Sequence, residues 1–122
     1  MDDLAKKKAQ RYLYLKRLYD LADGDTFPIF GFAEIGNQLG WDEVTTDKVI
    51  NYLRDEGLIR FVTFGTVSIT HAGVKQIENA ADHPDQPTRY FPASSLIIIS
   101  ASGDITIGGD VIGQNKKTNA SE

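Results

Sequence analysis

The sequence contains no cysteine, so disulfide bonds and thiolate metal sites are excluded, and nothing indicates an oxidising compartment. It also lacks a long apolar run. The strongest one, Leu96 to Ile99, is far shorter than the roughly 20 residues that a transmembrane helix needs. The charged first eight residues lack the apolar stretch of a signal peptide. We therefore expect a cytoplasmic protein without a membrane partner.

An excess of positive charge is also missing. The chain of 122 residues has 13 Lys and Arg against 17 Asp and Glu, a formal net charge of −4. A strongly basic balance would have indicated a nucleic-acid partner, so any contact with DNA must come from a local patch. Hydrophobic residues make up 41% and charged residues 25%. These values are typical of a globular chain, and the length allows one domain with an appendage.

Residue patterns with catalytic or metal-binding chemistry are sparse. His71 and His83 lie apart in the pattern and have no companion ligands, so no metal is expected. The glycine-rich tail lacks the Gly-Lys-Ser/Thr ending of a P-loop, and its single Gly-Gly-Asp piece lacks the stacked repeats of calcium-binding sequences. The carboxylates fall at expected helix caps or exposed faces. We predict that the chain is not an enzyme and uses no cofactor.

The first expected helix runs from about Asp3 to Leu21. One wide apolar face includes Leu4, whereas Leu13, Tyr14 and Leu21 fall outside that face. A monomeric domain gains little from exposing such residues, so they indicate either a second contact surface or isolated exposed side chains without a role. This helix is also the one cationic segment of the chain. Its basic residues are Lys6, Lys7, Lys8, Arg11, Lys16 and Arg17.

Two more helices are expected before the pattern changes. The second covers residues 30–39 and has Gly36 at a position where another helix can approach closely. Trp41 can pack beneath the following turn, and Asp42 is suited to cap a third helix over residues 43–56. The inward residues of that third helix are expected to be Thr46, Val49, Ile50 and Leu53.

After the third helix the apolar period changes from helical to strand-like. Residues 58–62 and 66–70 are rich in β-branched and aromatic side chains, and Thr63-Phe64-Gly65 between them is typical of a turn. Thr70 or His71 can then cap a final helix over residues 72–80, with Val74 and Ile77 inward.

This order of helix, helix, tight turn, helix, hairpin and helix resembles a winged helix-turn-helix domain. The resemblance lies in three segments, residues 35–41 (IGNQLGW), 49–59 (VINYLRDEGLI) and 67–78 (VSITHAGVKQIE). The middle segment is similar to a V-x-YL-x-x-x-GLI stretch of many bacterial winged-helix regulators, and the last is similar to their join between wing and final helix. The predicted fold class is therefore α+β, with three helices, a β-hairpin wing and a final helix, followed by a short β-rich tail.

The resemblance implies that the third helix enters the major groove of DNA and that the wing touches its backbone. The DNA-binding residues so implied are Thr45, Lys48, Asn51, Tyr52, Arg54 and Arg60. Further basic support is expected from Lys6, Lys7, Lys8 and Arg11. Two features oppose DNA binding. The third helix also carries Asp47 and Asp55, and residues 61–67 of the wing contain no basic residue, although phosphate contacts normally use Lys or Arg.

Composition divides the chain into four parts. Residues 1–81 form the expected winged-helix domain, and residues 82–95, with three of the four prolines, are expected to be an extended connector. Residues 96–113 are rich in Ile, Gly and Asp and are predicted to form β-strands. Residues 114–122 are polar and expected to be flexible.

The β-forming segment is similar to Gly-Gly-Asp-Val segments found at the ends or junctions of bacterial signalling and conflict-system proteins. Because one hairpin alone is marginally stable, we expect these strands to join copies of the chain in a homo-oligomer, with folding back onto the domain as the alternative. The residues expected to mediate oligomerisation are Leu96, Ile97, Ile98, Ile99, Ile105, Ile107, Val111 and Ile112.

Two functions from different classes follow from these patterns. In the first, the chain is a non-enzymatic transcription-regulator-like protein that binds double-stranded DNA as an oligomer. In the second, the winged helix binds another protein and the tail assembles the complex, for example in a bacterial defence or stress system. The fold resemblance favours the first function, and the acidic third helix with its uncharged wing favours the second.

Overall fold

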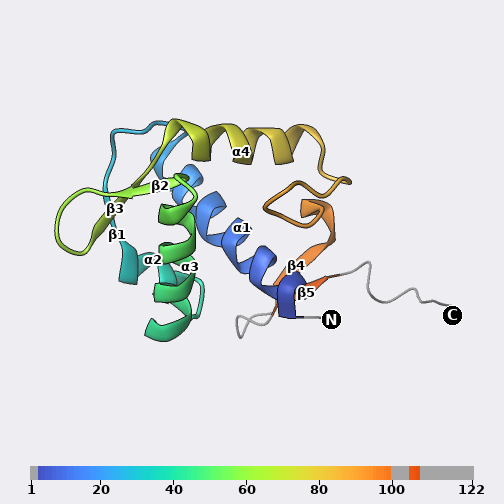
Figure 1. Ribbon diagram of the computed structural model, residues 1–122, viewed down its shortest axis with the longest axis horizontal. Coiled ribbons are helices and arrows are strands. Elements are labelled where there is room, and N and C mark those ends of the chain that lie inside the picture. Colours follow the sequence, from blue (N-terminus) through green and yellow to red (C-terminus); the bar gives the residue numbers. More distant parts are fainter. Residues whose placement is uncertain (1–2, 100–104, 108–122) are drawn as a thin grey trace, which may run out of the picture.

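The computed structural model describes residues 3–99 and 105–107. Within these residues the chain forms α1 (Asp3–Ala22), β1 (Phe30–Gly31), α2 (Phe32–Gln38), α3 (Glu43–Asp55), β2 (Ile59–Phe61), β3 (Thr66–Ile69), α4 (His71–Asp82), a 3-10 turn (Ser94–Leu96), β4 (Ile97–Ile99) and β5 (Ile105–Ile107) (Figure 1). The predicted α+β class is confirmed. The polar end over residues 114–122 and two predicted oligomerisation residues, Val111 and Ile112, lie outside the described residues.

A three-stranded antiparallel sheet has β3 at its centre, with β1 on one edge and β2 on the other. Phe30 lies opposite Val67 in the first pairing, and Arg60 lies opposite Ser68 in the second. We predicted that a helix would begin at residue 30, and this was wrong. Phe30 and Gly31 are extended because pairing with β3 satisfies their backbone groups, and α2 begins only at Phe32.

α1 is the central helix and lies against α2, α3, α4, β3 and β5 (Figure 1). Tyr14, outside the predicted apolar face, is fully buried, and its hydroxyl donates to the carbonyl oxygen of Phe32 at 3.0 Å. Burial raises the pKa of this hydroxyl above its ordinary value, so it stays a donor. Leu13 is half-buried against the same core. A helix enclosed on several sides buries more than one face, which the amphipathic pattern did not show.

Two other residues of α1 complete this correction. Leu4, which we placed on the buried face, is 56% exposed, whereas Leu21 is at the margin of exposure with 37%. The first turn of α1 therefore extends beyond the core. The supposed second contact surface is mostly the interior of the same chain.

The turn between α2 and α3 is held by local contacts that the sequence predicted. A Cβ atom on Gly36 would overlap the hydroxyl of Thr46, which confirms a close approach of the two helices. The Asp42 carboxylate caps α3 by accepting from the backbone N–H of Thr45 at 2.8 Å, and this hydrogen bond lowers the pKa of Asp42. Trp41 is buried and stacks on Tyr14, with ring centroids 6.2 Å apart.

The predicted inward residues of α3 and α4 are confirmed. α3 buries Thr46, Val49, Ile50 and Leu53, and α4 buries Val74 and Ile77. Thr70 caps α4 by accepting from the N–H of Gly73 at 3.1 Å. Gly73 itself lies so close to the sheet that a Cβ atom there would overlap the carbonyl oxygen of Leu58.

Residues 82–95, which we expected to be an extended connector, are exposed in their first half, but their second half packs against the core. Phe91 is fully buried and packs edge-on to the ring of Tyr12, with centroids 5.4 Å apart. The Thr88 hydroxyl accepts from the N–H groups of Tyr90 and Phe91, which closes a tight turn. The prolines prevent a helix here, but they do not prevent a loop from burying a large aromatic side chain.

The predicted strands of the tail form β4 and β5, which pair antiparallel with Ile98 opposite Thr106. β5 lies against α1, near the N-terminal end of that helix in Figure 1. The described strands therefore fold back onto the domain, which was our alternative expectation for the tail. Self-association of copies stays a prediction. None of the described helices has both the length and the apolar character needed to cross a membrane.

Candidate nucleic-acid interface

An open groove of about 360 Å³ runs between the first half of α1 and one side of α3. Its lining consists of Lys6, Lys7, Gln10, Arg11, Thr45, Lys48 and Val49. We call this set the cationic groove, because four of the seven residues are basic and none is acidic. The spacing of three to four residues within each helix places these side chains on the faces that α1 and α3 turn toward one another.

Arg11 is fixed at the wall of the cationic groove by Tyr52 of α3. The guanidinium carbon of Arg11 lies 3.4 Å from the centroid of the Tyr52 ring. This is a cation–π contact between two residues that are 41 positions apart. The Tyr52 ring, which belongs to the predicted DNA-binding residues, is half-buried and contacts Arg11.

The predicted DNA-binding residues do not form one surface. Thr45 and Lys48 line the cationic groove, and Asn51 is exposed on α3 outside that lining. Arg54 lies 3.3 Å from the Asp55 carboxylate and over the Phe61 ring, 4.9 Å from its centroid. The guanidinium of Arg60 donates to the carbonyl oxygen of Thr26 at 3.2 Å. Both arginines therefore face the hairpin and its neighbouring loop.

The basic residues of α1 also divide into two groups. Lys6, Lys7 and Arg11 face α3 across the groove, whereas Lys8 is not part of its lining. Lys16 pairs with Asp20 at 2.6 Å, and Arg17 donates to the Gln38 side chain at 2.9 Å. Only the first part of the cationic run contributes to the groove.

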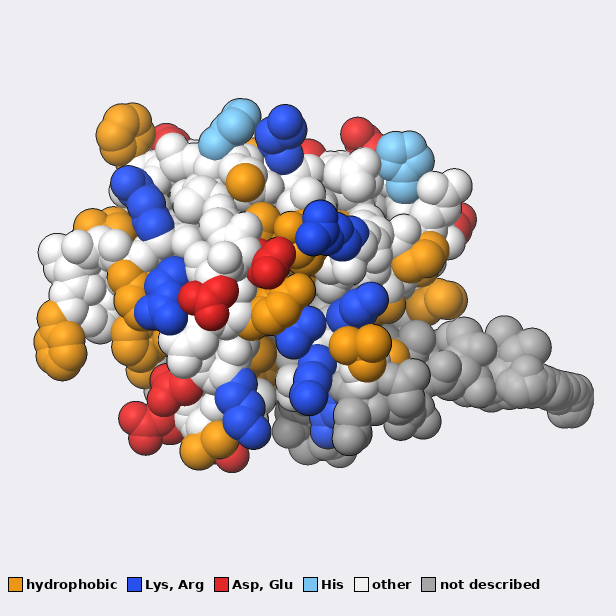
Figure 2. All heavy atoms as spheres, viewed as in Figure 1, with side chains coloured by type: hydrophobic (Ala, Val, Ile, Leu, Met, Phe, Trp, Pro, Cys, Tyr) orange, Lys and Arg blue, Asp and Glu red, His pale blue; other side chains and the backbone are white. Residues whose placement is uncertain are grey.

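The hairpin between β2 and β3 ends in an apolar tip. Phe61 and Val62 are each 41% exposed, and Phe64 is completely exposed. We call these three residues the apolar hairpin tip. Phe61 also stacks on Phe32, with ring centroids 6.0 Å apart. Figure 2 shows apolar side chains over this hairpin at the left, with basic side chains between them and α1.

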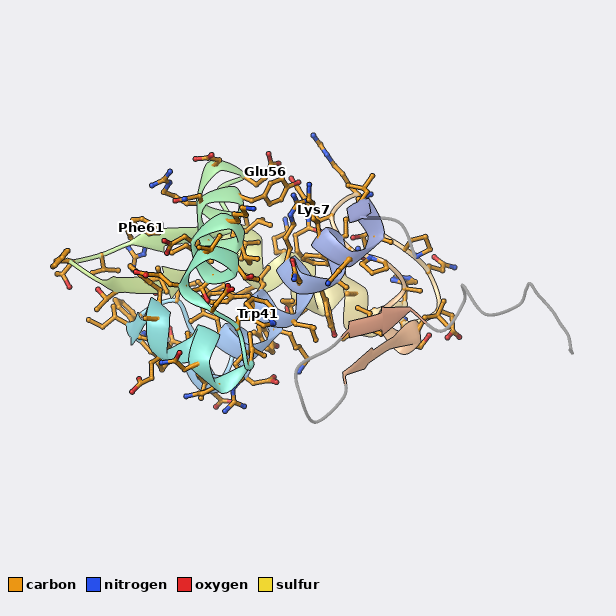
Figure 3. The ribbon with its side chains drawn as sticks, turned by 90° about the horizontal axis from the view of Figure 1, so that it is seen from below. Lys7, Trp41, Glu56 and Phe61 are labelled. Atoms are coloured by element: carbon orange, nitrogen blue, oxygen red, sulfur yellow. The ribbon has the colours of Figure 1, made fainter. Side chains whose placement is uncertain are left out.

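Figure 3 places the hairpin and the groove on opposite sides of α3, with Phe61 on one side, Lys7 on the other, and Glu56 at the end of the helix. The beginning of α3 has the opposite charge. A hollow of about 140 Å³ there is lined in part by Asp42, Glu43 and Asp47. We call these three residues the acidic corner. Charge is therefore separated along the molecule rather than evenly mixed.

No metal site is evident in residues 3–99 and 105–107, where no group of three or more His, Asp or Glu side chains is placed to hold an ion. His71 is exposed at the first position of α4, and the His83 ring contacts the carbonyl oxygen of Asn79 at 3.2 Å. Comparisons of the chain with protein-family models, with curated proteins and with solved structures found no match.

Proposed function

We propose that this chain is a non-enzymatic winged-helix protein that binds nucleic acid through the cationic groove and self-associates through β4 and β5. The observation that carries the first part is the gathering of Lys6, Lys7, Arg11 and Lys48 in one groove of a chain whose net charge is −4. Nucleic-acid affinity depends on Lys and Arg contacts to phosphates. Basic residues concentrated on an otherwise acidic chain favour a polyanionic ligand over general solvation.

The arrangement of the elements supports a winged-helix domain. α2 and α3 are joined by a tight turn, a hairpin follows α3, and α4 comes after it. In such a domain α3 is the recognition helix and β2 with β3 is the wing. Together with the resemblance of residues 49–59 and 67–78 to bacterial regulators, this supports a role in transcription regulation.

The groove itself provides the first test. Replacing Lys7 and Lys48 together with glutamine is expected to weaken binding of a short fluorescent oligonucleotide by about an order of magnitude at low salt, because two phosphate contacts are lost. The slope of log Kd against log salt concentration should fall by about 2, roughly one for each lysine. Fluorescence anisotropy over a salt series measures both quantities.

The matched control removes the same charge elsewhere. Lys16→Gln with Lys75→Gln changes net charge equally, but neither residue lines the cationic groove. An equal loss of affinity in both variants would show that the net charge of the chain attracts the oligonucleotide and that the cationic groove is not its binding site. Failure of the unaltered chain to bind any oligonucleotide at low salt would refute nucleic-acid binding altogether.

Unpaired strand edges support self-association. In the described residues β4 and β5 pair only with each other, and β5 lies against α1. The outer edge of β4 therefore presents backbone N–H and C=O groups that a second copy can pair with. We expect light scattering to give a higher mass for the full chain than for a version ending at Leu96, which keeps Phe91 and loses both strands. If both the full chain and the shortened version have the mass of a monomer, self-association through β4 and β5 is contradicted.

Protein binding is a second candidate function, and the acidic corner favours it. Val44, which follows Asp42 and Glu43 in the sequence, is 61% exposed, so an apolar side chain is accessible in the same turn of α3. Such a surface suits a basic partner protein and repels phosphate. A chain that forms oligomers but does not bind nucleic acid at low salt would fit this second function.

A further inference from the structure

Arg11 offers more than charge at the wall of the cationic groove. One side of its guanidinium is covered by the Tyr52 ring at 3.4 Å, and Arg11 also lines the groove. A guanidinium plane stacked in this way can accept a nucleobase on its other face, while its N–H groups reach a phosphate. The bases of a duplex are already stacked on each other and cannot use such a surface.

A second stacking surface lies across α3, at the apolar hairpin tip. Arg54 lies over the Phe61 ring at 4.9 Å, and Phe64 beyond it is fully exposed. Exposed aromatic rings beside basic residues are the composition of surfaces that bind unpaired strands, since every base has a face that can stack. Figure 2 shows basic and apolar side chains interspersed, together with a few acidic ones, on the face between the hairpin and α1.

The charges on α3 argue against a duplex. Asp47 and the exposed Asp55 project from the same helix as Lys48, and residues 61–67 of the hairpin contain no basic residue of their own. A rigid duplex that follows α3 brings its phosphates near these carboxylates. A flexible single strand can follow the groove with its phosphates, stack a base on Arg11 and then bend around α3 to reach the tip on the other side.

We propose that the cationic groove and the apolar hairpin tip together bind single-stranded nucleic acid in preference to double-stranded nucleic acid. This inference rests on the proposed function and specifies its ligand. Lys6, Lys7 and Lys48 bind phosphates, Arg11 holds a phosphate and stacks on a base, and Phe64 stacks on a second base. Single-stranded DNA and RNA share this chemistry.

The test uses the full chain with three probes of equal length, which are oligo(dT), oligo(rU) and a mixed-sequence duplex. We expect at least one single strand to bind about tenfold more tightly than the duplex or better. Phe64→Ala should weaken single-strand binding about tenfold, and Phe27→Ala is its matched control, because Phe27 is 84% exposed on a different loop. Arg11→Lys keeps the charge but loses the planar group, so it should weaken single-strand binding more than duplex binding.

Each result separates this inference from the function on which it rests. A duplex that binds as tightly as both single strands would overturn the inference and leave nucleic-acid binding intact. Absence of binding to all three probes would overturn the proposed function itself. A preference for single strands that survives both Phe64→Ala and Arg11→Lys would overturn the stacking surfaces proposed here.

Discussion

Replacing Phe91 with alanine is expected to lower the free energy of unfolding by about 3–5 kcal/mol, the range for truncating a fully buried phenylalanine. The side chain is fully buried and packs edge-on against Tyr12 of α1. Its removal loses both the transfer free energy of the ring and the contacts around the cavity that remains. Urea unfolding, followed by circular dichroism and by the fluorescence of the single tryptophan, Trp41, measures the change.

Phe27→Ala is the control, because that ring is 84% exposed and its loss should change the free energy of unfolding by no more than about 0.5 kcal/mol. The same reasoning applies to shortened chains. A version ending at Ala81 lacks Phe91 and should unfold at lower urea concentration than one ending at Leu96. If Phe91→Ala proves as mild as Phe27→Ala, residues 82–95 do not contribute to the stability of the core.

Gly73→Ala is the second substitution with a large expected effect, a loss of about 1–3 kcal/mol in the free energy of unfolding. Alanine is the better helix former by about 1 kcal/mol, so propensity alone predicts the opposite sign. The added Cβ atom would overlap the carbonyl oxygen of Leu58 and lie 2.8 Å from a side-chain carbon of Ile69. That carbonyl accepts from the N–H of Thr70 at 3.1 Å, so it cannot move without straining the sheet.

Gly31→Ala is the matched control for this prediction. Gly31 has a φ of −66°, and a Cβ atom there would meet only Glu34, at 3.8 Å. We expect this variant to change the free energy of unfolding by no more than about 1 kcal/mol, because alanine meets no overlapping atom, and its lower conformational freedom in the unfolded chain offsets its poorer fit at the N-cap of α2. Thermal and urea unfolding of both variants give the comparison. Equal stability of the two would show that α4 and β2 can separate at little cost.

Local signals in the sequence determined much of the helical framework. The spacing of Thr46, Val49, Ile50 and Leu53 predicted the buried face of α3, and Gly36 predicted a close helix approach. The cap at Asp42 was also predicted, and Thr70 was one of the two residues expected to cap α4. These features depend on hydrogen bonds and side-chain spacing within a few residues, so the order of amino acids contains them directly.

The tertiary structure alone decided which of these elements meet and which side chains they enclose. Phe30 lies in a strand because its backbone pairs with β3. Tyr14 is buried because other elements surround α1. The candidate site arose in the same way. Lys6, Lys7 and Arg11 are far from Lys48 in the sequence. The packing of α1 against α3 brings the four residues together in one groove. Nothing near Arg11 in the sequence indicated Tyr52 as its partner, because a contact across 41 residues depends on how whole helices pack.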